Sequence, residues 1–394
     1  MKVFIVGAGA VASVISNFLA KDGEISKVIC GSNDLKRAKE FINTRFKKIS
    51  LKKVDASSIE NLVKATKGFD LVINASLPRF NLNVMQACLK VKANYQDLAS
   101  ELADLKTAEQ LSFHKKFKKA GLVALINSGI APGVSNLLAR EADDVLDEID
   151  TIDFRLVEEQ KASELIFTWS IETTLDELTA QPLNFRNNKF ILTRPFSGAE
   201  EYDFPHPIGK KKVFSIYGDE VSTLPFYIKT KNITFKSSGT DIDFSKALHR
   251  LGLFEKKPVN VNGLWISPVE FFSKIAPKIP TPKEMIKMAK SGIIENAYFS
   301  LVVEAVGKEK GKHVKIKNSA IFPDMKAIFK KLPGANYISY PIGLAAYSFL
   351  KVLPKIKTFG VLPPEALDEK IRNQILLELE NNGIIVNEEF SVIK

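Results

Sequence analysis

Residues 3–12 read Val-Phe-Ile-Val-Gly-Ala-Gly-Ala-Val-Ala, and this stretch decides the fold. Val3–Val6 is a short apolar run typical of a buried strand, and a helical pattern follows it directly. In the G-x-G-x-x-A spacing, Gly7 allows a tight turn, Gly9 lets the backbone approach a pyrophosphate, and Ala12 keeps the helix close to the strand. The helix start adds free N–H groups and the positive end of its dipole. The predicted cofactor contacts are Gly7, Gly9, Ala10 and Val11.

Strand-like and helical segments alternate up to about residue 130. A capping box at Ser57–Glu60 predicts one helix start, and Ser32, Asn33 or Asp34 is expected to cap a helix that runs through Phe46. This alternation predicts right-handed crossovers and a doubly wound parallel sheet, a Rossmann domain of residues 1–130. The other strand-like runs are Lys27–Cys30, Lys52–Val54, Leu71–Asn74, Tyr95–Leu98 and Leu122–Ile126.

The pattern changes after about Val145, where longer alternating stretches begin. Hairpin signals occur at Asn187-Asn188 and at Gly307–Gly311. We therefore expect residues 131–340 to form an α+β domain with a mainly antiparallel sheet, with a stiff linker at Pro277–Pro282. The alternating stretches are Thr151–Val157, Phe190–Arg194, Lys212–Tyr217 and Asn296–Val306.

From Gly343 onward the pattern is helical again, and it ends with a long amphipathic helix from Pro364 to Asn382. We expect residues 341–394 to form a C-terminal helical segment that packs back on the first domain.

Composition limits the class of protein. A chain of 394 residues with 45% hydrophobic residues fits a soluble globular protein of two domains. Two cysteines and four scattered histidines give neither a disulfide framework nor a metal site, so we expect a cytoplasmic protein without a metal. The charge of +11 is spread along the chain, which favours anionic small molecules over nucleic acid. No apolar run is long enough to span a membrane.

The choice between NAD and NADP depends on the end of the second strand. An NAD site usually places an acidic residue there, but Ser32 and Asn33 occupy the position, and Lys36 and Arg37 follow. These residues favour the 2′-phosphate of NADP, whereas an alternative in which Asp34 serves NAD stays open. The further predicted cofactor contacts are Ser32, Asn33, Arg37 and Asp55.

Several later segments, in order along nearly the whole chain, resemble the saccharopine dehydrogenase-like family. One of them, Gly129–Asn136, matches that family's G-x-x-P-G-x-S-N turn. That family includes saccharopine reductase, lysine 6-dehydrogenase and carboxynorspermidine dehydrogenase. The other matching segments are Phe69–Pro78, Asn81–Cys88, Tyr95–Ala99, Pro207–Gly209, Leu248–Leu253, Ser267-Pro268 and Phe359–Glu365.

The resemblance implies an enzyme that uses NAD(P) to interconvert an amine and an imine of an amino acid or polyamine-type substrate. It also implies that the C-terminal segment completes the Rossmann domain and that the α+β domain helps to form a homodimer. The loop with Asn74, Ala75 and Pro78 would border the nicotinamide ribose. Gly133, Ser135 and Asn136 would begin a helix that faces the same cleft and contacts substrate.

Such chemistry benefits from a base, because hydride leaves the carbon only when its nitrogen is unprotonated. Asp97, at the carboxyl end of a predicted central strand, is the first candidate, and Tyr95, which has the same side-chain parity, is the second. The alternative for Asp97 is an N-cap of a helix that starts near Ala103.

One departure from the family pattern concerns its carboxylate-binding arginines. Lys236 and Tyr340 stand where those arginines would be, and Lys236 can pair with a carboxylate only as a point charge. Lys236 is kept as a substrate-binding candidate. Two alternatives to a C–N oxidoreductase stay open: a reductase of a less polar C=O or C=C bond, and a non-catalytic dinucleotide-binding sensor.

Overall fold

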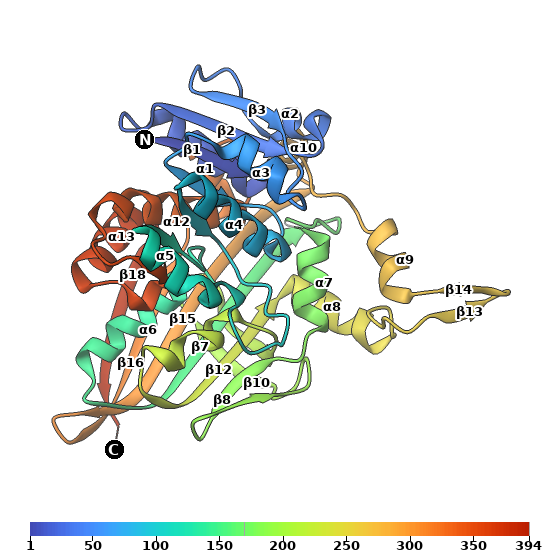
Figure 1. Cartoon of the computed structure of the whole chain (residues 1–394). Helices are drawn as coiled ribbons and strands as arrows, with labels where there is room; N and C mark the ends of the chain where they lie inside the picture. The colour runs from blue at the N-terminus through green and yellow to red at the C-terminus, as the bar shows by residue number, and fades with distance from the viewer. Residues whose placement is uncertain (169, 394) are drawn as a thin grey trace. The chain divides into compact units, whose positions relative to one another are not determined.

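The computed structural model describes residues 1–168 and 170–393. The chain forms two compact units, and it passes between them several times (Figure 1). The first unit comprises Met1–Val145, Ser222–Lys229 and Ser339–Val386. The second unit comprises Leu146–Val221, Thr230–Ile338 and Asn387–Lys394.

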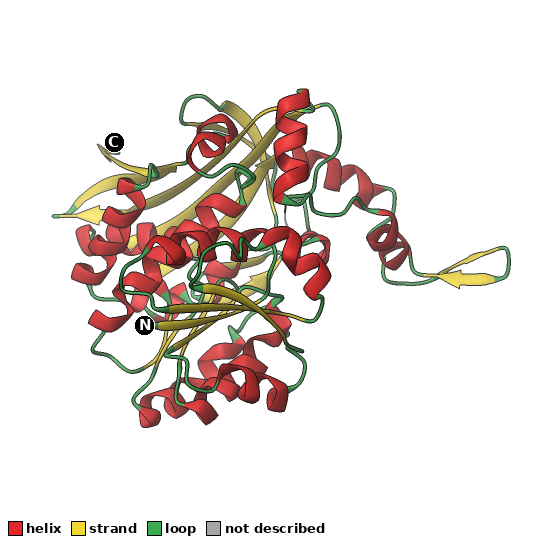
Figure 2. Cartoon of the chain, turned by 90° about the horizontal axis from the view of Figure 1, so that it is seen from above, coloured by secondary structure: helices red, strands yellow, loops and turns green. Residues whose placement is uncertain are grey.

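The first unit contains a seven-stranded parallel sheet, as predicted. Its strands are short and mostly buried because helices cover both faces (Figure 2). The last strand in the chain, β17, pairs with β6 and so completes the sheet, as the family resemblance implied. The order across the sheet is β17 (Gly360–Leu362), β6 (Val123–Leu125), β5 (Asn94–Asp97), β4 (Leu71–Asn74), β1 (Lys2–Val6), β2 (Lys27–Ser32) and β3 (Ile49–Lys53).

Six helices of the first unit pack in two groups. In one group α1 packs against α12, and α12 packs against α13; in the other, α4 packs against α3 and α5. The amphipathic pattern of α1 explains its placement, since Val14, Ile15 and Leu19 are buried. The helices are α1 (Ala10–Lys21), α2 (Leu35–Phe41), α3 (Ile59–Thr66), α4 (Asn81–Val91), α5 (His114–Ala120), α6 (Val134–Val145), α12 (Ser339–Val352) and α13 (Glu369–Asn381).

Helix boundaries differ from the predicted ones. Asp34 caps α2 by accepting from the Arg37 amide, but α2 ends at Phe41 rather than Phe46. Ser58, not Ser57, caps α3. The predicted helix from Pro364 is divided, because the backbone of Leu367 and Asp368 is not helical, into the short 3-10 helix η6 (Pro364–Ala366) and α13.

The second unit is built on a nine-stranded, mainly antiparallel sheet, again as predicted. Among the strand pairs of this sheet whose register is described, only β7 and β12 run parallel. Both predicted hairpins are confirmed: Asn187 and Asn188 turn between β8 and β9, and Lys310 and Gly311 turn between β15 and β16, all with positive φ. The strands are β7 (Glu148–Ala162), β8 (Leu183–Arg186), β9 (Lys189–Leu192), β10 (Glu200–Phe204), β11 (Gly209–Ser215), β12 (Thr230–Gly239), β15 (Ile294–Glu309), β16 (Lys312–Ile321) and β18 (Ile385–Val392).

Helices and a separate hairpin complete this unit. Helix α8 packs on β7 and β12, while α10 and α11 pack on β15. The hairpin of β13 (Val259–Val261) and β14 (Leu264–Ile266) stands away from the sheet, and its Leu264 and Trp265 are exposed (Figures 1 and 2). The sequence interpretation did not anticipate this hairpin. The helices are α7 (Ile171–Thr179), α8 (Thr240–Arg250), α9 (Pro268–Ile275), α10 (Pro282–Ser291) and α11 (Met325–Lys331).

The compact units differ from the domain ranges predicted from sequence. Helix α6 belongs to the first unit, because Arg372 of α13 forms ion pairs with Glu141 and Asp144 of α6. The C-terminal segment is not entirely helical, since β18 joins the sheet of the second unit beside β16. None of the described helices is long and apolar enough to cross a membrane. The cytoplasmic location stays a prediction.

Candidate active site

The predicted cofactor residues lie at the carboxyl edge of the parallel sheet. In this sheet β1 lies between β2 and β4. The chain adds β2 and β3 on one side of β1, and then it crosses over and adds β4 on the other side. In open parallel sheets, ligands bind at this reversal point. The structure brings three predicted segments together here: the loop after β1, the end of β2 and the loop after β4.

Gly7 lies between these segments. Its amide donates to the Gly31 carbonyl at 2.8 Å, and the Ala75 amide donates to the Val6 carbonyl at 2.8 Å. Its φ is +108°, and a Cβ there would lie 2.5 Å from the Ala75 carbonyl oxygen. The loop after β1 therefore depends on glycine both for its backbone conformation and for its close approach to the loop after β4.

Gly9 differs from Gly7, because a Cβ built on it meets no atom within 4 Å. Gly9 is the N-cap of α1 and supplies no side-chain cap, and the first turn of α1 has no acidic residue. The start of α1 therefore has no side-chain cap, and the open space at the Cβ position of Gly9 leaves room for a pyrophosphate to approach the backbone. The residues present fit a dinucleotide, with Ala10 and Val11 in the first turn.

The end of β2 carries the residues predicted to select the cofactor. Ser32 Oγ accepts from the Asp34 amide at 3.1 Å, and Asn33 is exposed. The Asp34 carboxylate accepts from the Arg37 amide at 3.0 Å, so it caps its own helix. The Arg37 guanidinium lies 3.6 Å from Glu40 and is partly exposed. Asp55 follows β3 as an exposed carboxylate, whose pKa is lowered by hydrogen bonds from Ser57.

The loop after β4 is held by buried amides. Asn74 is 2% exposed; its Nδ2 donates to Asn81 Oδ1 at 2.8 Å, and its Oδ1 accepts from the Ser76 amide at 3.1 Å. Ala75 and Pro78 are partly exposed. Asn81 Nδ2 in turn donates to the Ala99 carbonyl at 2.9 Å and to Glu109 at 3.0 Å. Asn74 therefore fixes the loop, and the less buried residues beyond it are left to contact a ligand.

Asp97 and Tyr95, the two candidates for a base, are both buried at the end of β5. Asp97 Oδ1 accepts from the Asn127 amide at 2.7 Å, and Oδ2 lies 2.9 Å from Gln110 Nε2 and 2.8 Å from the Tyr95 hydroxyl. Burial raises the pKa of Asp97 to about 7, although these hydrogen bonds act to lower it. Burial, with the neighbouring Asp97 charge, also raises the pKa of Tyr95 well above its usual value.

The helix-cap alternative for Asp97 is wrong. No helix begins near Ala103; the next helical element among the described residues is the 3-10 helix Glu109–Phe113. Instead Asp97 joins the ends of β5 and β6, because it holds Asn127 at a φ of +54° and its carbonyl accepts from the Ser128 amide at 3.0 Å. Whether Asp97 also acts as a base stays a prediction.

The predicted substrate residues Gly133, Ser135 and Asn136 surround the start of α6. Gly133 has φ +137°, and a Cβ there would lie 2.0 Å from the Gly129 carbonyl oxygen. Ser135 and Asn136 are completely buried, and Asn136 Nδ2 donates to Glu365 at 3.1 Å. The described contacts of Asn136 thus hold the unit together, and its contact with substrate stays a prediction.

Two regions of the chain match known protein domains. Residues 3–125 match the saccharopine dehydrogenase NADP-binding domain, and residues 129–384 match the saccharopine dehydrogenase C-terminal domain. The chain belongs to the saccharopine dehydrogenase family.

Two proteins of known name are similar in sequence to this family member. Carboxynorspermidine synthase of Vibrio cholerae is 29% identical over 67% of this chain and 66% of that protein, slightly less than two thirds of its length. Carboxyaminopropylagmatine dehydrogenase of Synechocystis is 26% identical over 93% of both chains.

Two solved structures share the fold of this family member over 99% of its chain. The L-Glu-forming saccharopine dehydrogenase of Saccharomyces cerevisiae has a TM-score of 0.72 at 16% identity and is covered to 99%. The homospermidine synthase of Legionella pneumophila, solved in complex with NAD, has a TM-score of 0.71 at 14% identity and is covered to 91%.

Lys236 is the one predicted site residue of this family member that lies in the second unit. It is on β12, and its ammonium lies 2.6 Å from Glu200, which also pairs with Arg155 at 2.6 Å. Lys236 therefore already has a carboxylate partner within the chain.

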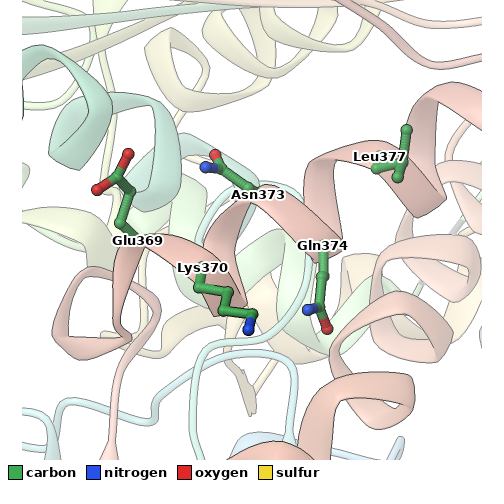
Figure 3. A pocket seen from close by; sticks show the side chains of 5 residues that line it. All are labelled: Glu369, Lys370, Asn373, Gln374 and Leu377. Atoms are coloured by element: carbon green, nitrogen blue, oxygen red, sulfur yellow. The ribbon is translucent and has the colours of Figure 1, made fainter.

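An open hollow of about 380 Å³ lies on α13 and contains none of the predicted residues (Figure 3). Its side chains all come from this one helix, so it is unrelated to the strand ends. They are Glu369, Lys370, Asn373, Gln374 and Leu377.

The sequence interpretation missed the buried partners of the site in this family member. Gln110 and Asn127 contact Asp97, and Glu365, 1% exposed, contacts Asn136. Burial raises the pKa of Glu365 to about 7. Glu365 lies in a segment that carried the family resemblance, so it was within reach, whereas Gln110 has no motif of its own.

Proposed function

We propose that this protein is an NAD(P)-dependent oxidoreductase that interconverts an amine and an imine of an amino acid or polyamine-type substrate. The observation that carries the proposal is the open, uncapped start of α1 beside Gly9, within a chain whose N-terminal region matches an NADP-binding domain. The names of two relatives, a carboxynorspermidine synthase and a carboxyaminopropylagmatine dehydrogenase, support substrates with C–N bonds.

Different residues of the chain would bind the cofactor and transfer the proton. The amides at the start of α1 would hold the pyrophosphate, and the Asn74–Pro78 loop would border the nicotinamide, which supplies or accepts hydride when bound. Asp97, with its raised pKa of about 7, would take or return the proton on nitrogen. Its connections to Asn127 and, through Tyr95, to Asn81 join the loops after β4 and β6.

A cofactor-turnover screen tests this function. NADPH oxidation with imines formed from an aldehyde and an amine, and NADP reduction with lysine, saccharopine and diamines, should give turnover with at least one C–N substrate. Apolar carbonyl compounds serve as the comparison. Turnover restricted to those carbonyls would favour a C=O reductase, and cofactor binding without any turnover would favour a sensor protein.

We further propose NADP as the preferred cofactor. Support comes from the end of β2, where the Asp34 carboxylate already caps α2 and Lys36 is exposed. A 2′-phosphate near Ser32 would thus meet cationic side chains and a hydroxyl, without an acidic residue in Ser32's own position.

Ser32→Asp should reverse this preference. A carboxylate at the end of β2 can accept from ribose hydroxyls but repels a 2′-phosphate, so the ratio of NADPH to NADH affinity should fall at least about tenfold. Fluorescence titration with both cofactors measures it. Ser26→Asp, the same change at the opposite end of β2, is the matched control. Tighter binding of NADH than NADPH by the unmodified protein would contradict the proposal.

The homodimer also stays a proposal. It is supported by the exposed apolar side chains of the β13–β14 hairpin, among them Leu264 and Trp265, since soluble proteins seldom leave such patches uncovered. Light scattering at micromolar concentration should give twice the mass of one chain, and a monomer there would refute it.

A further inference from the structure

A lysine outside the predicted cofactor contacts lies beside Ser32. Lys53 is the last residue of β3, and it pairs in register with Ser32, the last residue of β2. The amide of Val54 donates to the Ser32 carbonyl at 2.9 Å and so fixes the two strand ends side by side. Both strands belong to the first unit. Lys53 therefore lies next to the position at which a ribose 2′-phosphate is expected.

The side chain of Lys53 lies on the same face of the sheet as that of Ser32. Side chains alternate between the two faces along a strand, and residues that pair in register on parallel strands share a face. Cys30, two residues before Ser32, forms a side-chain hydrogen bond with α1, so this face is the one that α1 covers. Lys52 points the other way, because its Nζ donates to a carbonyl of α3 at 3.4 Å. Of these two lysines, Lys53 is the one on the face of Ser32 and α1.

Lys53 is available to an added anion. It is exposed, and its ammonium makes no hydrogen bond or ion pair with a described residue. Arg37, the cation predicted from the sequence, is already engaged: its guanidinium lies 3.6 Å from Glu40 and 5.2 Å from the centre of the Phe41 ring. A phosphate at the end of β2 would therefore find Lys53 without a competing partner, whereas Arg37 would have to leave its contacts.

The acidic residues of the two neighbouring loops are held within their own turns. The Asp34 carboxylate accepts from the Arg37 amide at 3.0 Å. The Asp55 carboxylate accepts from the Ser57 amide at 2.9 Å and from the Ser57 hydroxyl at 2.7 Å. Neither carboxylate pairs with Lys53, so the positive charge at the end of β3 is not neutralised by them.

We propose that Lys53 binds the 2′-phosphate of NADP and thereby helps to set the preference for NADP over NAD. Its ammonium would add charge-assisted donors beside the Ser32 hydroxyl, and lysine binds phosphate as a point charge, which suits a long side chain at a strand end. NAD has a hydroxyl in place of this phosphate and would gain little from Lys53. The inference rests on the proposed function for the identity of the ligand as a dinucleotide, but the binding itself does not require turnover.

Fluorescence titration of the full chain with NADPH and with NADH tests the inference. Lys53→Met should weaken NADPH binding at least about tenfold, because charge-assisted hydrogen bonds to the phosphate are lost, and should leave NADH binding unchanged. Lys53→Arg keeps a cation and should retain the preference. Lys52→Met is the matched control: it removes the neighbouring lysine, on the opposite face, and should change neither affinity. Circular dichroism checks that each variant folds.

A double variant tests whether Lys53 acts at the position of Ser32. In Ser32→Asp the new carboxylate would lie beside Lys53 and pair with it, so the ammonium would no longer be available to a phosphate. Adding Lys53→Met to Ser32→Asp should therefore change the ratio of NADPH to NADH affinity by less than about threefold. An effect of Lys53→Met that is equally large with and without Ser32→Asp would place Lys53 away from this position and overturn the inference.

Two further results would overturn it: an NADPH affinity that Lys53→Met leaves unchanged, or an equal loss of NADPH and NADH affinity in that variant. The fate of the proposed function is read separately, from turnover with C–N substrates. If the preference for NADPH depends on Lys53 but no C–N substrate turns over, the phosphate site stands and the oxidoreductase proposal fails. If a C–N substrate turns over and Lys53→Met binds NADPH as the unmodified protein does, the oxidoreductase proposal stands and this inference fails.

Discussion

Replacing Gly9 with valine should reduce NADPH affinity at least about 100-fold and leave the fold intact. The branched side chain would occupy the open space where a pyrophosphate has to approach the backbone amides of α1, and charge-assisted hydrogen bonds of that kind contribute about 1.5–3 kcal/mol each. The fold should tolerate the change because the φ of Gly9 is −95° and no atom lies within 4 Å of its Cβ position. Fluorescence titration with NADPH measures the affinity, and circular dichroism checks the fold.

Gly23→Val provides the matched control. Gly23 lies in the turn after α1, also has open space around its Cβ position, and is away from the strand ends. This variant should bind NADPH as the unmodified protein does. Unchanged affinity in Gly9→Val would remove the loop after β1 from the cofactor site.

Asp97→Asn is expected to lower turnover at least about tenfold and to change its pH dependence. A carboxyl group with a pKa of about 7 is neutral below that pH and ionised above it, and a base works only when ionised. The rate of amine oxidation should therefore rise as pH passes through about 7 in the unmodified enzyme and lose this rise in the variant. Steady-state rates across that range are the measurement.

The variant also carries a structural cost, which the contacts of Asp97 predict. The new amide N–H₂ must face the Gln110 or Asn127 donor, so we expect a loss of about 1–3 kcal/mol in stability. Tyr95→Phe removes one hydrogen bond to Asp97 but keeps the carboxylate, so it should retain the rise near pH 7. If Asp97→Asn keeps the rise, Asp97 only positions the loops, and a different group is the base.

Features that depend on contacts between residues close in sequence could be predicted, whereas features that depend on contacts between distant residues could not. The β1–Gly7–α1 unit was predictable because its turn, glycine spacing and helix start depend on neighbouring residues. The network around Asp97 was not, because Gln110 and Asn127 reach it only after the sheet places the ends of β5 and β6 together. The cap interpretation failed for the same reason, since Gln110 and Asn127 are 13 and 30 residues from Asp97 in the sequence.

The charge of a residue predicted its binding partner less well than its place in the folded chain does. Lys236 was predicted to bind a substrate carboxylate, but Glu200, which is 36 residues away in the chain, already pairs with it. Conversely, the close approach of Gly239 on β12 to the Glu158 carbonyl on β7 has no signal in the sequence, because it depends on how the two strands pair. Such pairings depend on strand register, which a single sequence specifies only through the finished sheet.

The interleaved chain also sets the order in which the protein can be completed during synthesis. The parallel sheet has its first six strands by Leu125, but β17, which pairs with β6, ends at Leu362. At roughly 5–20 residues per second, the β6 edge waits on the order of ten seconds or more for its partner. A nascent chain, or any fragment ending before Gly360, therefore presents an unpaired strand edge, the kind of surface that templates aggregation. The parallel sheet of the first unit is therefore completed only after most of the second unit has been synthesised, although its sequence begins first.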